Sequence, residues 1–187
     1  MTCATCGCIM NAFQRGKTVS QEVGTMKRIV WDPAKCTGCR VCEAICSFVK
    51  EGEFNPVKAR GKVVITVENQ IRYSVRVSCL QCEEAYCKAV CPTGAISEND
   101  AGVKIVDEQK CIGCKLCEIA CPVGAIVVDS ESGVAMKCDL CAGLDEPQCV
   151  KYCYTEALKY LPSEKVGISL ARAKSQKYLD MAKGEVA

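Results

Sequence analysis

The chain has 187 residues, of which 19 are cysteine and none is histidine, and its formal net charge is +2. The lack of histidine excludes Cys2His2 zinc fingers, Rieske centres, His-ligated haem and every Ser-His-Asp or Cys-His catalytic arrangement. The hydrophobic share of 49% includes the cysteines and only 5% of residues are aromatic, so the organic core is thin for this length. A cysteine content of about one in ten indicates a disulfide scaffold or a metal–thiolate protein.

The N-terminal extension, residues 1–28, carries three closely spaced cysteines, Cys3, Cys6 and Cys8. One interpretation is an additional metal site completed by a fourth ligand from elsewhere or from a partner chain, and the other is a flexible, reduced tail. The extension lacks a signal peptide, and no segment approaches about 18 consecutive apolar residues. We therefore expect a cytoplasmic protein without a membrane span, in a compartment where reducing conditions disfavour disulfides.

Four groups of four cysteines follow, and each group ends in Cys-x3-Cys. Pro92 and Pro122 directly follow the second and third groups, and the third group matches the bacterial ferredoxin run C-x2-C-x2-C-x3-C-P residue for residue. Zinc ribbons instead pair two knuckles across a spacer, so a structural or regulatory zinc protein is a weaker alternative. In chain order the groups are Cys36-x2-Cys39-x2-Cys42-x3-Cys46, Cys79-x2-Cys82-x4-Cys87-x3-Cys91, Cys111-x2-Cys114-x2-Cys117-x3-Cys121 and Cys138-x2-Cys141-x7-Cys149-x3-Cys153.

This spacing has a physical cause. Three thiolates in a C-x2-C-x2-C loop wrap three corners of one 4Fe–4S cube, whereas the cysteine after x3 lies at the end of a short helix and reaches the other cluster of a pair. Gly38 and Gly113 let the backbone approach the cube closely, and the prolines fix φ after the fourth ligand. The sequence therefore predicts paired 4Fe–4S clusters.

Between the cysteine groups, the chain repeats one unit of strand, cysteine loop, short helix, turn and strand. Period-2 patterns at 62–67 and 71–77 flank residues 68–70 and predict a β-hairpin, and shorter hairpins are expected to turn at 99–102 and 130–133. Residues 166–183 have helical composition, and a helix packed on its own domain is favoured over one that docks a partner. The predicted fold class is small α+β.

The order of the four groups resembles the iron–sulfur electron-transfer subunits that accompany molybdenum and tungsten pterin enzymes, a family typified by the dimethyl sulfoxide reductase B subunit. The resemblance covers residues 29–160. It implies two fused bacterial 2x 4Fe–4S ferredoxin-like modules, an outer one of residues 29–61 and 127–161 and an inner one of residues 79–126. A β-hairpin insertion (62–78) and a C-terminal helical tail (162–187) complete the expected chain.

The same resemblance implies how the cysteines are shared among four 4Fe–4S clusters, because the first group pairs with the fourth and the second with the third. The implied ligand sets are as follows: a first set of Cys36, Cys39, Cys42 and Cys153; a second set of Cys46, Cys138, Cys141 and Cys149; a third set of Cys79, Cys82, Cys87 and Cys121; and a fourth set of Cys91, Cys111, Cys114 and Cys117.

Residues 36–48 and 51–56 are most similar to the small subunits that partner tungsten aldehyde:ferredoxin oxidoreductase-type proteins, as in aldehyde oxidoreductase complexes and class II benzoyl-CoA reductase. Two positions depart from the family pattern, because Ser47 and Tyr154 stand where proline would follow the last cysteine of the outer groups.

Four thiolates per cluster leave no open iron for a substrate, so the resemblance implies a subunit without catalytic residues. It would relay single electrons between a large pterin-containing catalytic subunit and a flavin subunit or ferredoxin. A free-standing soluble polyferredoxin and a subunit of a hydrogenase or formate dehydrogenase complex are the alternatives, and self-association stays open.

Four clusters would bring the net charge to about −6, so the formal +2 is no argument for nucleic acid binding. Arg40, Lys110 and Lys115 either offset cluster charge or are solvated surface residues.

Overall fold

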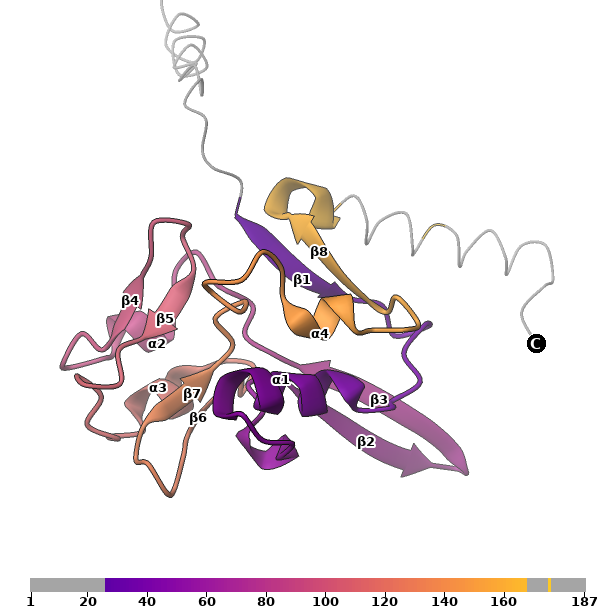
Figure 1. The fold of residues 1–187 in the computed structure, drawn as a ribbon, viewed down its shortest axis with the longest axis horizontal. Coiled ribbons are helices and arrows are strands. Elements are labelled where there is room, and N and C mark those ends of the chain that lie inside the picture. Colours follow the sequence, from indigo (N-terminus) through magenta and orange to yellow (C-terminus); the bar gives the residue numbers. More distant parts are fainter. Residues whose placement is uncertain (1–25, 168–174, 176–187) are drawn as a thin grey trace, which may run out of the picture.

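The computed structural model describes residues 26–167 and 175 (Figure 1). Cys3, Cys6 and Cys8 lie outside the described residues, as does most of the helix expected over residues 166–183. Residues 163–167 are helical. The expected α+β class is confirmed by an alternation of short elements. In chain order they are β1 (Lys27–Trp31), α1 (Val41–Glu51), the 3-10 helix η1 (Pro56–Lys58), β2 (Lys62–Glu68), β3 (Ile71–Val77), α2 (Tyr86–Ala89), β4 (Ile96–Glu98), β5 (Lys104–Val106), α3 (Leu116–Ala120), β6 (Ile126–Val128), β7 (Ala135–Lys137), α4 (Gln148–Lys151) and β8 (Leu158–Pro162).

The strands form four antiparallel two-stranded ribbons in the described part of the chain. Strands β2–β3, β4–β5 and β6–β7 are hairpins, and all three turn where the sequence predicts. The fourth ribbon pairs β1 with β8, with Lys27 opposite Pro162 and Trp31 opposite Leu158. Figure 1 shows this ribbon beside α4, and α1 packs on α4, so the first and fourth cysteine groups meet although they are distant in sequence.

Helix α1 has 11 residues, whereas α2, α3 and α4 have four or five. Its extra length follows from Ser47, because a proline there would clash with the preceding turn and remove a helical N–H. The buried Ser47 hydroxyl donates to the Ala44 carbonyl (2.9 Å) and accepts from the Asn55 N–H (3.1 Å). The helix ends at Gly52, whose positive φ of 74° caps it while its N–H donates to the Phe48 carbonyl.

The core consists of two small clusters that contain cysteines as well as aliphatic side chains. One joins Ile96 and Ile126 to Cys117, and the other joins Val103 and Leu140 to Cys138. The cysteine sulfurs therefore belong to the interior itself.

A buried carboxylate ties α1 to the hairpin. Glu43, which is 1% exposed, accepts a hydrogen bond from the Val63 N–H (2.6 Å) and forms an ion pair with Arg40. Because one side chain satisfies both a backbone donor on β2 and a cation at the start of α1, the hairpin is held at a fixed angle to the helix.

None of the helices within residues 26–167 has the length and apolar composition that a bilayer span requires.

The close approach of two loops at Gly113 should make this position intolerant of any side chain. A Cβ at Gly113 would lie 2.5 Å from the carbonyl oxygen of Gly133, whereas a Cβ at Gly124 would meet nothing within 4 Å, and both residues have positive φ (66° and 63°). Gly124→Ala therefore carries only the left-handed backbone penalty of about 1–2 kcal/mol, and Gly113→Ala adds an overpacking cost of about 1–3 kcal/mol. We expect a clearly larger loss of thermal midpoint and of bound iron in Gly113→Ala. Equal losses in the two variants would contradict the steric contact.

Candidate metal centres

Three cavities of similar size are each lined by four cysteines drawn from two of the four sequence groups. The space between protein atoms in them, part of which is open to solvent, is about 390, 430 and 330 Å³. Their cysteines are, respectively, the first set (Cys36, Cys39, Cys42 and Cys153), the third set (Cys79, Cys82, Cys87 and Cys121) and the fourth set (Cys91, Cys111, Cys114 and Cys117).

The second set lies between α1 and α4. Cys46 is on α1 and Cys149 on α4, and Cys138, Cys141 and Cys149 are all buried. The thiols of Cys46 and Cys149 are close enough to Cys138 to influence its charge. Cys149 is in turn close enough to Cys141 to influence its charge. The structure thus brings together the members of every set that the resemblance implies, and only the N-terminal trio falls outside the described residues.

The four sets follow one another in space. Cys42 of the first set interacts with Cys149 of the second, and Cys138 of the second packs in one apolar cluster with Cys79 of the third. Cys121 of the third set belongs to the same cluster as Cys117 of the fourth. At the two ends of this row, Cys39 and Cys114 are exposed.

The cysteine loops use an unusual backbone. Gly38 and Arg40 in the first group, and Gly113 and Lys115 in the third, have φ between 62° and 66°. A non-glycine residue in this conformation costs about 1–2 kcal/mol, and such residues gather at functional sites. The left-handed residues let the chain curl around each cavity, so that the cysteines converge on its centre.

Backbone N–H groups donate to several of the sulfurs. Hydrogen bonds of this kind favour the thiolate form and adjust the properties of a bound metal. The second, third and fourth sets each receive at least one: Arg60 N–H to Cys46 Sγ (3.2 Å), Leu140 N–H to Cys138 Sγ (3.4 Å), Ala125 N–H to Cys121 Sγ (3.3 Å) and Ala135 N–H to Cys111 Sγ (3.4 Å).

Burial has the opposite effect on the metal-free thiols, because it favours their protonated form. It raises the pKa of Cys42 and Cys117 to about 11 and that of Cys138 to about 12. These thiols hold their protons at neutral pH unless a positive ion takes the proton's place, so binding of iron must release protons from the site.

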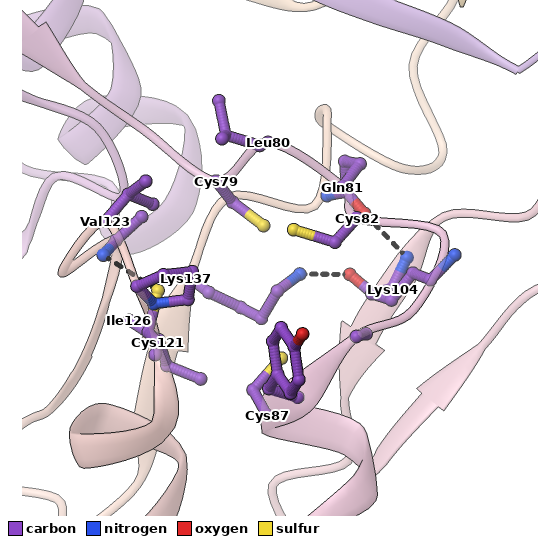
Figure 2. A pocket seen from close by; sticks show the side chains of 14 residues that line it. Cys79, Leu80, Gln81, Cys82, Cys87, Lys104, Cys121, Val123, Ile126 and Lys137 are labelled. Atoms are coloured by element: carbon purple, nitrogen blue, oxygen red, sulfur yellow. Dashed lines mark hydrogen bonds between the residues drawn. The ribbon is translucent and has the colours of Figure 1, made fainter.

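Lys137, which is buried, and Arg76, which is half-buried, both face the cysteines, and the sequence pattern singled out neither. Lys137 is 5% exposed and crosses the cavity of the third set (Figure 2), where its ammonium donates to the carbonyls of Lys104 and Cys138. Arg76 on β3 lines the cavity of the first set and donates to Cys149 Sγ (3.4 Å). Of the three cations singled out from the sequence, Arg40 and Lys110 form ion pairs with nearby acids, with Glu43 and Asp107 respectively.

Alternation along β3 could have pointed to Arg76, but with the reverse assignment of faces. The apolar residues Ile71, Tyr73 and Val75 are about half exposed, whereas Ser74 and Arg76 turn inward. A polar interior contradicts the usual pattern of an amphipathic strand, and it is explained by sulfur in place of hydrocarbon beneath the hairpin.

The residues around the first cavity fit an iron–sulfur cube. Three buried side-chain nitrogens in the described residues lack a hydrogen-bond partner, and two of them, Trp31 Nε1 and Arg76 Nε, belong to residues that line this cavity. Buried donors need acceptors, and sulfide and thiolate sulfur would supply them. No group of three or more Cys, Asp or Glu side chains among the described residues is arranged to hold a single metal ion.

Four convergent cysteine sets on short α+β units define an iron–sulfur protein of the ferredoxin type. A family model described as a 4Fe–4S dicluster domain matches residues 70–161. The polyferredoxin-like subunit of aliphatic sulfonate oxidoreductase from Pyrococcus furiosus is 34% identical over 88% of this chain and 96% of its own length. The B subunit of anaerobic dimethyl sulfoxide reductase from Escherichia coli is 34% identical over 72% of this chain and 73% of its own length.

Among solved structures, a component of the active site complex BamBC of benzoyl coenzyme A reductase is 27% identical, covering 84% of this chain and 96% of that one, with a TM-score of 0.42. The protein belongs to the family of 4Fe–4S dicluster electron-transfer subunits represented by the dimethyl sulfoxide reductase B subunit. It is an electron-transfer subunit rather than a catalytic one, and it binds 4Fe–4S clusters through its cysteines.

The buried ammonium of Lys137 should stabilise the loops around the cavity of the third set. Lys137→Met keeps the length of the side chain but leaves the carbonyls of Lys104 and Cys138 unpaired, at about 1–3 kcal/mol each. We expect a lower thermal midpoint and iron loss, measured on the iron-loaded protein. Lys110→Met is the matched control, because Lys110 is exposed and its surface ion pair with Asp107 is screened by solvent. Indistinguishable midpoints for the two variants would refute a structural role of Lys137.

Proposed function

We propose that this protein relays single electrons through four 4Fe–4S clusters, one in each cysteine set, between a catalytic subunit that carries a tungsten or molybdenum pterin and another redox partner. The observation that carries the proposal is the convergence of four cysteines on each cavity, from the two groups that a paired-cluster ligation requires. The near-equal size of the three cavities supports one kind of guest in all of them.

A 4Fe–4S cluster held by four thiolates supplies reversible one-electron chemistry and offers no iron site to a substrate. The protein's own residues bind and position the clusters. Cysteines hold each cluster, backbone N–H groups donate to the cysteine sulfurs, and small residues such as Gly113 let neighbouring loops approach each other closely. The row of sets supports a linear relay, and the exposed Cys39 and Cys114 mark its ends as the points nearest to partners.

The module boundaries belong to the same proposal. The outer module, 29–61 with 127–161, would contain the β1–β8 ribbon and the α1–α4 contact, and the inner module, 79–126, would contain α2 and α3. The hairpin insertion, 62–78, coincides with β2 and β3 and lies against the outer module through Glu43 and Arg76.

Two observations favour a role inside a complex over that of a free carrier. The Pyrococcus and Escherichia relatives are both named as components of oxidoreductases. The segments 36–48 and 51–56 resemble small subunits of tungsten enzymes, which makes a tungsten pterin partner the first choice.

Ligation is tested by iron content and paired substitutions. The intact chain should bind about sixteen iron atoms, and each Cys→Ala variant should lose about four. Because Cys36 and Cys153 would share a cluster, the double variant C36A/C153A should lose no more iron than either single variant. C36A/C46A should lose about eight, since those cysteines belong to different sets. Equal iron losses in the two double variants, or about four iron atoms in the intact chain, would contradict the proposal.

The partner is tested by purification of the tagged full-length chain from its native cells. We expect a large subunit containing tungsten or molybdenum and a pterin to copurify, detected by metal analysis and by extraction of the pterin. Recovery of the chain as an iron-loaded monomer that reduces and oxidises reversibly in solution would instead support the free-standing polyferredoxin.

A further inference from the structure

Arg76 is the charged residue of the hairpin that lines the cavity of the first cysteine set. It lies on β3 opposite the buried Val63 of β2, on the face of the hairpin that turns toward the protein. Gly61 makes room for it, because a Cβ at Gly61 would lie 3.0 Å from Arg76 Nη2. Glycine at position 61 therefore leaves room for the guanidinium beside the start of β2.

That place is between two cysteine sets. Arg76 lines the cavity of the first set, and its Nη2 is 3.4 Å from Cys149 Sγ of the second set. The charges of Cys42 and Cys138, one from each set, also interact with the guanidinium. One cation thus lies next to both the first and the second cysteine set, which are the two sets of the proposed outer module.

No carboxylate neutralises this cation. Within the described residues Arg76 forms no salt bridge, and its Nε is buried without a hydrogen-bond partner. A half-buried charge without a counter-ion and a buried donor without an acceptor are both costly, so the site calls for anionic acceptors. Arginine suits this position because its guanidinium stays protonated and presents several donors in a planar fork.

We propose that Arg76 is a shared counter-ion of the first and second clusters, which raises the reduction potentials of both and so sets the driving force at this end of the relay. The inference rests on the proposed function, because it takes the cluster assignment from there. Reduction adds one negative charge to a cluster, and a fixed neighbouring cation stabilises the reduced form more than the oxidised one. The role of the hairpin insertion would then be to position this cation between the two clusters.

The test is a redox titration of the iron-loaded full-length chain, followed by electron paramagnetic resonance, with three variants. Arg76→Gln removes the charge and should shift the one-electron equilibria of two centres about tenfold toward the oxidised form, which is about 59 mV. Arg76→Lys keeps a charge but not the fork, and it should shift the same two centres by less. Arg72→Gln is the matched control: Arg72 lies on the same strand and donates to the Gly38 carbonyl, but it is exposed.

The outcomes separate the alternatives. Lower potentials of two centres in Arg76→Gln, with little change in Arg72→Gln, support the shared counter-ion. Unchanged potentials with full iron content, a shift of one centre only, or equal shifts in both Gln variants overturn it. If Arg76→Gln loses iron, Arg76→Lys decides: full loading with a smaller shift of the same two centres supports the counter-ion, whereas iron loss in Arg76→Lys as well makes Arg76 merely structural. Fewer than four centres in the unaltered chain would overturn the proposed cluster count, a failure distinct from that of Arg76.

Discussion

Closure of the cysteine sets is the constraint on which the rest of the structure depends. Every set combines cysteines from two sequence groups, and the first and second sets join residues that are more than ninety positions apart, such as Cys42 with Cys153. Bringing such segments together costs chain entropy that two small hydrophobic clusters compensate poorly. Metal ligation supplies the missing stabilisation, because the free energy of metal binding becomes free energy of folding when the ligands come from distant segments. The ribbons and short helices serve mainly to present cysteines at the right angles.

Concentrating sulfur in a small interior also determines which charged residues matter for the structure. Most ion pairs of the described chain are at or near the surface, where their contribution is small, as for Lys110 with Asp107. The cations that matter are those withdrawn from carboxylates, Lys137 in the third cavity and Arg76 beside the first. Both come from strands that adjoin a cysteine group, so the elements that position the ligands also bring the compensating charge. Burial alone would leave the thiols protonated, and the neighbouring N–H donors and cations act against that tendency.

Most of the fold and of the candidate site could be predicted from the spacing of the cysteines. The geometry of an iron–sulfur loop is local, because it follows from residues close in sequence. The same holds for the three hairpins, whose turns are local as well. Three features depend on contacts that no local pattern reveals. The length of α1 depends on Ser47 bridging to Asn55, and the burial of Lys137 depends on the carbonyl of Lys104 from another segment. The inward orientation of Arg76 reverses the hydrophobic alternation of β3. That alternation misleads because the rule assumes a hydrocarbon interior, whereas the interior beneath this hairpin is lined by sulfur.

The pairing of β1 with β8 also determines when each part of the protein becomes complete during synthesis. With the proposed ligation, Cys79 to Cys121 contain everything that the third and fourth clusters require, so these two can be loaded while the C-terminal part is still being translated. The first and second clusters must wait for Cys153 and Cys149, which are among the last cysteines to leave the ribosome. Under that ligation, Cys36, Cys39, Cys42 and Cys46 lack their remaining partner cysteines for most of translation, a period in which these thiols must stay reduced if they are to bind iron.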